Sequence, residues 1–392
     1  MATEITPRHP GLRNGPIYLD YNATTPADPR VVEAALPYLT EHFGNPSSTH
    51  HYGQAARQAV RQARGEVAGL LGAHSDEIVF TAGGSDSDTL AIRGAARANR
   101  DRGDHVITQA TEHPAVLEAC RSLQADSFRL TILPVNHHGQ VDPADLRQAI
   151  TGDTALVSIM LANAETGTLQ PVSQLSRIAH AHDALFHTDA AQAAGKIPVD
   201  VTELGVDLLT VVGHKMYAPK GVGALYVRAG TAMQPTIHGG GQEHGLHAGT
   251  ENVALIAALG AASCIAADSL PQSASQLADL RDRLHQRLTE LLPDRVSLNG
   301  HPDHRLPGTL NVSVSNTRGT DVLAATPEIA AATGSACHEG IDEPSLVLSA
   351  MGQPPERALG ALRFSLGRWT TADEVERAAQ LIAGGVTHLA RT

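Results

Sequence analysis

The 392-residue sequence has little of several features that would assign it to a specialised class of protein. Aromatic residues make up only 3%, so Ala, Val, Leu and Ile must form most of the core. The three cysteines, Cys120, Cys264 and Cys337, are too few for a disulfide framework, and we expect a reducing, cytoplasmic setting. No apolar run approaches 18 residues, so no transmembrane helix is expected, and the N-terminus lacks the apolar segment of a secretory signal.

A concentration of charge of one sign is also missing. The formal net charge is −12, with acidic and basic residues interspersed along the chain. This argues against nucleic acid or a membrane surface as the main partner. The length exceeds that of one typical core and suggests two domains.

Strand-like and helical segments alternate through the first two thirds of the chain and predict an α/β fold with a mostly parallel sheet. The strand-like runs are 77–82, 105–110, 155–162, 184–190, 207–212 and 223–228. From about residue 265 the pattern changes to one long helix, a strand-like run at 309–316 and a last helix from Ala372. We therefore predict a large domain over 21–264 and a small α+β C-terminal domain that consists of 265–392 together with residues 1–20 and carries Cys337.

One segment has the pattern of an anion-binding turn. In FTAGGSDSDTLAIRG (80–94) a strand ends at Thr81, two glycines follow, and Ser85 begins a helix. Free N–H groups at a helix start attract anions such as phosphate. A serine that simply caps the helix explains the segment equally well.

Asp189 and Lys215 point to a specific cofactor. Asp189 ends an apolar strand and would stabilise a protonated pyridine nitrogen, although a helix cap is the alternative. Lys215 follows the strand-like run at 207–212, where it suits a Schiff base with an aldehyde. Together with the anion-binding turn, these residues favour pyridoxal 5′-phosphate (PLP).

The chain resembles the cysteine desulfurases, PLP enzymes of the class V aminotransferase type. The resemblance extends over nearly the whole length and implies PLP fold type I, the aspartate-aminotransferase-like fold. It rests on these motifs: YLDYNATTP (18–26), FGNPSSTHHYG (43–53), TEHPAV (111–116), NAETG (163–167), HTDAAQ (187–192), GHKMYAPKG (213–221), HGGGQEHGLHAGTEN (238–252), GSAC (334–337) and LRFSLGRWTT (362–371).

The resemblance implies roles for the residues around the cofactor ring. Lys215 would hold PLP as a Schiff base and move a proton at the substrate Cα. His113 would stack on the ring and serve acid–base steps, Asp189 would pair with the ring nitrogen, and Gln192 would bond the ring oxygen O3′. Cys337, in the small-residue segment ATGSACHEG, would be the nucleophile that takes the sulfur.

Further residues would hold the phosphate and the substrate. Arg363 would bind the substrate carboxylate, which suits the fork of a guanidinium. Asn163 is a second candidate for substrate binding. The phosphate ligands implied by the resemblance are Gly84, Ser85, His214 and, from the partner subunit of a homodimer, Thr250.

Three positions depart from the family pattern. Ala164 stands where an Asn usually reaches the ring oxygen, Val212 where a Ser often binds the phosphate, and His247 where an Arg is often found. Each lost hydrogen bond to a charged group removes roughly 1.5–3 kcal/mol. These departures would weaken PLP binding unless water or repacking compensates for them, or they mark a different substrate.

The leading interpretation is a cysteine desulfurase that converts L-cysteine to L-alanine, forms a persulfide on Cys337 and passes the sulfur to a thiol acceptor. A PLP-dependent lyase or aminotransferase for another amino acid, including a selenocysteine lyase, is the alternative. A non-catalytic scaffold is a third interpretation, against which Lys215 argues. No residue spacing predicts a metal site, and the acceptor protein is not encoded in any motif.

Overall fold

A computed structural model describes residues 8–333 and 343–391. Its centre is a seven-stranded sheet in the order β2-β8-β7-β6-β5-β3-β4. Only β8 runs against its neighbours, so the prediction of a mostly parallel sheet is confirmed. The strands are β2 (Ile78–Thr81), β3 (His105–Gln109), β4 (Arg129–Leu133), β5 (Thr154–Ser158), β6 (Leu185–Asp189), β7 (Leu208–Val212) and β8 (Gly223–Val227).

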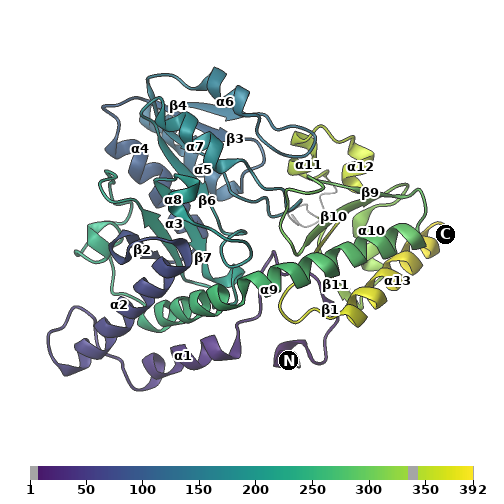
Figure 1. Ribbon diagram of the computed structural model, residues 1–392, viewed down its shortest axis with the longest axis horizontal. Helices are drawn as coiled ribbons and strands as arrows, with labels where there is room; N and C mark the ends of the chain where they lie inside the picture. Colours follow the sequence, from purple (N-terminus) through teal and green to yellow (C-terminus); the bar gives the residue numbers. More distant parts are fainter. Residues whose placement is uncertain (1–7, 334–342, 392) are drawn as a thin grey trace.

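Helices cover both faces of this sheet (Figure 1). Strands buried on both faces read as continuous apolar runs, which is why six of the seven were recognisable in the sequence. The edge strand β4 was missed, because most of its side chains are at least partly exposed. Ile107, Val157 and Phe186 belong to one core cluster, and Val106 and Leu156 belong to another on the opposite face. The helices of this part are α1 (Pro29–Thr40), α2 (His51–Leu71), α3 (Gly84–Thr89), α4 (Ala95–Ala98), α5 (Pro114–Ser122), α6 (Pro143–Ala149), α7 (Val172–His180) and α8 (Val201–Leu204).

A second, smaller layer lies toward the C-terminus. The antiparallel sheet β12-β10-β9 is accompanied by the parallel pair β1-β11, which ties the N-terminal segment to this layer. Its strands are β1 (Ile17–Tyr18), β9 (Val296–Leu298), β10 (Thr309–Val314), β11 (Ile329–Ala330) and β12 (Ala361–Ser365). Its helices are α10 (Gly319–Ala324), α11 (Leu346–Ala350), α12 (Pro355–Leu359) and α13 (Ala372–Leu389).

One long helix, α9 (Val253–Leu291), joins the two layers (Figure 1). Its first third, up to Ala266, belongs to the core of the large sheet, and Leu280, Leu284 and Leu288 belong to the core of the small one. By length and composition alone α9 would suit a membrane span, but more than half of its most apolar stretch is buried inside the protein. Its packing is that of a core helix. The domain boundary at residue 265 falls inside it and stays a prediction.

Candidate active site

The predicted site residues follow strands that point the same way. Lys215 follows β7 in a short 3-10 turn, Gly213–Lys215, and Asp189 is the last residue of β6. His113 and Asn163 lie in the segments after β3 and β5. Because parallel strands end at one edge of a sheet, these residues gather where α/β proteins bind their ligands.

Lys215 is held against the N-terminal segment. Its Nζ donates hydrogen bonds to the backbone oxygens of Asn22 at 2.6 Å and Ala23 at 2.8 Å. Burial and the positive charge of Arg363 lower the pKa of Lys215 to about 8, although Asp189 and Asp20 oppose the shift. The lowered pKa gives Lys215 a larger fraction of neutral amine near neutral pH than an ordinary lysine has, and the neutral amine is the form that attacks an aldehyde.

Asp189 and His113 form the polar surroundings of this amine. Asp189 is 8% exposed and accepts a hydrogen bond from the Ala191 N–H at 2.8 Å. Burial raises the pKa of Asp189, and His113 and Lys215 oppose the rise. His113 caps α5, with Nδ1 accepting from the Ala115 N–H at 3.1 Å. Burial lowers the pKa of His113, so its imidazole is favoured in the neutral form.

The anion-binding turn lies between β2 and α3. Gly83 has φ +146°, a backbone conformation that residues other than glycine rarely adopt. A Cβ on Gly84 would lie 2.8 Å from Cγ2 of Val212, so the valine fills the space beside the turn. Ser85 is exposed at the start of α3, with its hydroxyl available to a ligand. The turn is therefore open on one side and packed on the other.

Two histidines have side-chain partners on other segments. His214 Nδ1 is 3.1 Å from the hydroxyl of Thr24, and burial together with nearby lysines lowers the pKa of His214 to about 4. A neutral His214 can donate one hydrogen bond to a phosphate. His247 Nε2 lies 2.7 Å from Oδ2 of Asp86, so the residue in place of the family's Arg ties the 236–252 segment to α3.

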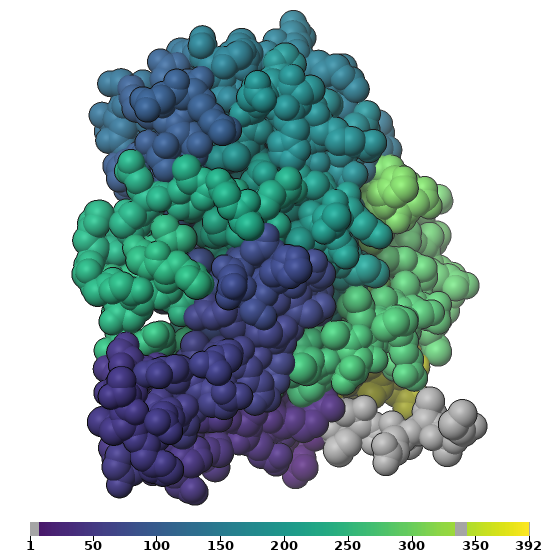
Figure 2. Space-filling model, turned by 60° about the vertical axis from the view of Figure 1, so that its left-hand side comes forward, coloured from purple at the N-terminus to yellow at the C-terminus, as the bar shows by residue number. Residues whose placement is uncertain are grey.

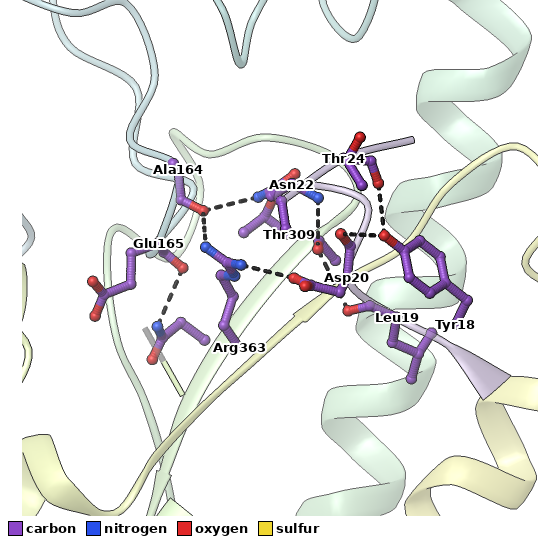
Figure 3. Close-up of polar contacts among 12 residues, drawn as sticks. Tyr18, Leu19, Asp20, Asn22, Thr24, Ala164, Glu165, Thr309 and Arg363 are labelled. Carbon is purple, nitrogen blue, oxygen red and sulfur yellow. Dashed lines mark hydrogen bonds and ion pairs between the residues drawn. The ribbon is translucent and has the colours of Figure 1, made fainter. Parts of the chain in front are cut away.

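Arg363 enters the site from β12 (Figure 3). Its guanidinium donates to Oδ1 of Asp20 at 2.7 Å and to the backbone oxygen of Ala164 at 3.4 Å. Its Nε is buried and has no partner in the described part of the chain. Since a guanidinium carries five N–H donors, several remain for a ligand carboxylate.

Asn22 connects these groups and was missed as a functional residue. Its Nδ2 donates to the Ala164 oxygen at 3.0 Å and to the Thr309 hydroxyl at 2.9 Å (Figure 3). Its backbone oxygen accepts from Lys215 and, at 3.0 Å, from Gln192 Nε2. The motif YLDYNATTP signalled the segment, but nothing in the sequence revealed these contacts.

Asn163 and Ala164 stabilise the segment after β5. Asn163 Nδ2 donates to the Thr111 oxygen at 3.0 Å, and its Oδ1 accepts from the N–H groups of Glu165 and Thr166, both at 2.9 Å. Its amide therefore builds the turn, and its contact with substrate stays a prediction. Ala164 contributes its backbone oxygen, a contact that does not depend on its side chain.

Of the remaining candidates, one lies on another exposed segment and the other is not among the described residues. Thr250 is exposed, on a segment whose Gly249 N–H donates to Gln242 Oε1 at 3.2 Å. Cys337 falls outside the described residues. Cys120 is buried in the core on one face of the large sheet, whereas Cys264 is exposed on α9.

The described residues fit PLP. A lysine of lowered pKa, a buried carboxylate and a glycine turn with an exposed serine match the aldehyde, the ring nitrogen and the phosphate of that cofactor. The buried, unpartnered Nε of Arg363 fits the carboxylate of an amino-acid substrate.

Comparisons with known proteins agree with this assignment. The aminotransferase class-V family matches residues 17–378. Cysteine desulfurase IscS from Dictyoglomus turgidum is 48% identical over 361 residues, covering 92% of this chain and 91% of that protein. A solved structure of a NifS-like protein has a TM-score of 0.89 at 36% identity, covering 95% of this chain and all of the other. A structure of SspA in complex with cysteine has a TM-score of 0.79 at 36% identity and covers 90% of this chain and 99% of the other. The chain therefore belongs to the class V aminotransferase family and, within it, to the PLP-dependent cysteine desulfurases.

Proposed function

We propose that this enzyme converts L-cysteine to L-alanine and that Cys337 receives the sulfur as a persulfide. The observation that carries the proposal is that Lys215 and Arg363, from separate segments, bond the backbone oxygens of Asn22 and Ala164 while the charges of Arg363 and Asp189 both act on Lys215. In the net reaction the C–S bond of the substrate breaks and an S–S bond to Cys337 forms. The thiol proton replaces the sulfur on carbon, so no external oxidant or reductant is needed for this step.

Each residue has a task that its surroundings support. Arg363 would bind the substrate carboxylate with the guanidinium N–H groups that Asp20 and Ala164 leave free. PLP, when bound through Lys215, supplies an electron sink that stabilises negative charge at the substrate Cα. Lys215, freed by the incoming amine, would carry the proton at Cα, since its pKa of about 8 lies near working pH. Asp189 would hold the ring nitrogen in its protonated form.

Sulfur chemistry is supported by the cysteine in the segment ATGSACHEG and by the relative whose structure holds cysteine. The persulfide would pass to a protein thiol acceptor. We place the enzyme in the cytoplasm, where thiols remain reduced and can accept sulfur.

The first experiment measures alanine released from L-cysteine by the PLP-loaded protein in the presence of a thiol reductant. Wild type is compared with Cys337→Ala and with Cys264→Ala, which removes an exposed thiol on α9 as a matched control. Alanine from wild type and the control, but not from Cys337→Ala, supports the proposal. Equal alanine from all three would instead indicate a lyase that does not use Cys337.

We also propose that the enzyme is a homodimer. Large apolar side chains are exposed on α1, the segment that follows it and the start of α2: Val32 48%, Leu36 52%, Leu39 69%, Phe43 75% and Tyr52 56%. In Figure 2 this purple part of the surface lies on the same face as the green residues around 240. An apolar patch of this kind marks a protein interface. A second copy of the chain would cover it and bring Thr250 toward the other subunit's phosphate site.

Leu39→Glu tests this interface, because a buried, unpaired charge strongly disfavours association. Sedimentation should show dimers for wild type and monomers for the variant. Leu291→Glu is the control, because Leu291 is also exposed but lies on α9, away from α1 in the sequence. This variant should remain dimeric. A wild type that sediments as a monomer would overturn the dimer proposal.

A further inference from the structure

Lys196 occupies a position that the roles above do not use. It follows β6 by seven residues, and its Nζ is 2.6 Å from Oε1 of Gln192 and 3.0 Å from Oδ1 of Asn22. In the described part of the chain, both of its hydrogen bonds go to amide oxygens. Burial and the nearby charges of Lys215 and Arg363 lower the pKa of Lys196 to about 7, so the position is unfavourable for an ammonium. A group kept in such a place calls for a functional reason.

The bonds of Lys196 determine how the Gln192 amide is oriented. Lys196 Nζ donates to two amide oxygens, and in its protonated form it can only donate, so the atom of Gln192 that faces it is the oxygen. The nitrogen then faces the Asn22 backbone oxygen, which can only accept, at 3.0 Å. Both contacts therefore require the same orientation, and Gln192 is 6% exposed, so water does not compete freely.

This orientation places the amide N–H donors beside the catalytic lysine. The Asn22 oxygen that accepts from Gln192 Nε2 also accepts from Lys215 Nζ. The two nitrogens thus converge on one oxygen atom. An amide nitrogen has two hydrogens, and Asn22 uses one, so the second remains for a cofactor held by Lys215.

We propose that Lys196 is a positioning residue that holds the Gln192 amide with its NH2 group toward the cofactor bound at Lys215. The inference rests on the proposed role of Gln192 as a donor to the ring oxygen of PLP. Without Lys196, Oε1 of Gln192 loses its charged partner and the amide can turn. The ring oxygen would then face an acceptor or lose its donor.

The test uses the visible absorption band of the PLP-loaded enzyme, titrated with pH without substrate. Gln192→Leu should raise the pH midpoint of the absorption change by about one unit, because a ring oxygen that loses a donor holds its proton more tightly. Lys196→Met should also raise this midpoint. Lys196→Met added to Gln192→Leu should give no further shift, and Lys220→Met, at an exposed lysine beyond Lys215, should match wild type.

The outcomes separate the two hypotheses. No shift in Gln192→Leu would overturn the role of Gln192 itself. A shift in Gln192→Leu without one in Lys196→Met would overturn the inference about Lys196 alone. An equal effect of Lys196→Met in the wild-type and Gln192→Leu backgrounds would also overturn it, because Lys196 would then act directly through its charge.

A second variant covers the case in which Lys196→Met does not fold. Lys196→Arg keeps a side chain that can only donate, so it should retain the wild-type midpoint if donation to Gln192 Oε1 is what fixes the amide. A midpoint as high as that of Gln192→Leu would contradict the inference.

Discussion

Arg363 shows how one residue depends on its neighbours for specificity. Two N–H groups of its guanidinium are held by Asp20 and Ala164, which orients the rest of the fork. A lysine offers a point charge and no fork, so it cannot satisfy Asp20 and a carboxylate together with the same geometry. We expect Arg363→Lys to raise the KM for L-cysteine about 10- to 100-fold, with a smaller effect on kcat.

Steady-state alanine release measures this effect. The control is Arg281→Lys. Arg281 lies on α9 and donates to the backbone oxygen of Leu306, so this variant should keep the wild-type KM. A KM that is unchanged in Arg363→Lys would mean that another residue binds the carboxylate.

His247 gives the protein a pH-dependent contact. The hydrogen bond to Asp86 raises the pKa of His247, so the folded state favours the protonated ring. Burial alone would raise the pKa of Asp86, but the bonds from His247 and the Ala82 N–H lower it. The stabilisation is therefore complete below the unfolded His pKa of about 6.5 and above the unfolded Asp pKa of about 3.9, and it is lost as pH rises through the raised pKa of His247.

His247→Gln should therefore lower the free energy of unfolding by about 1 kcal/mol between pH 4 and pH 6.5, with solvent screening included. The difference from wild type should shrink above neutral pH. Urea unfolding of the cofactor-free protein at a series of pH values checks this. A difference that grows with pH would show that the protonated His247 is not the stabilising form.

At the scale of an element, the anion-binding turn depends on the fit between Gly84 and β7. An alanine at position 84 would place its Cβ 2.8 Å from Val212, and a β-branched neighbour has little freedom to move away. We expect Gly84→Ala to weaken PLP binding by about tenfold or more, since overpacking costs roughly 1–3 kcal/mol. Equilibrium dialysis of PLP measures the effect.

The double variant Gly84→Ala, Val212→Ala is the informative control. It removes the methyl group that clashes, so most of the affinity should return. If the double variant binds no better than Gly84→Ala, the contact with Val212 is not the cause of the weakening.

Sequence patterns predicted the elements that are locally defined and missed those that depend on distant partners. Six of the seven strands of the large sheet are short, mostly buried runs that were predicted, whereas the partly exposed edge strand β4 was missed. Asp189 ends one of the predicted strands, and Lys215 follows another by three residues. The span of α9 was only partly recognised, because Ala-rich residues from 253 and the charged residues beyond 275 look like separate segments. Asn22 and Lys196 could not be found, since their contacts join residues up to 287 positions apart.

At the scale of the whole molecule, the site is incomplete if Thr250 acts on the other subunit. Thr250 and the apolar side chains of α1 are exposed in the single chain. The purple N-terminal part of the surface and the green residues around 240 lie on the face that Figure 2 shows. In such a dimer each site combines Lys215 of one chain with Thr250 of the other. Two inactive or weakened variants can then restore one intact site when they assemble together.

Mixing Lys215→Ala with Thr250→Val tests this arrangement. Each variant alone should release little alanine, because one lacks the amine that holds the cofactor and the other lacks a phosphate ligand in both sites. In the mixed dimer one site carries both changes and the other carries neither, so the mixture should recover up to about half of the wild-type activity per mixed dimer. If Thr250 serves its own chain, no site in the mixed dimer is intact and activity should not rise above the average of the two variants. Co-expression with two different affinity tags and sequential purification isolates the mixed dimer for this measurement.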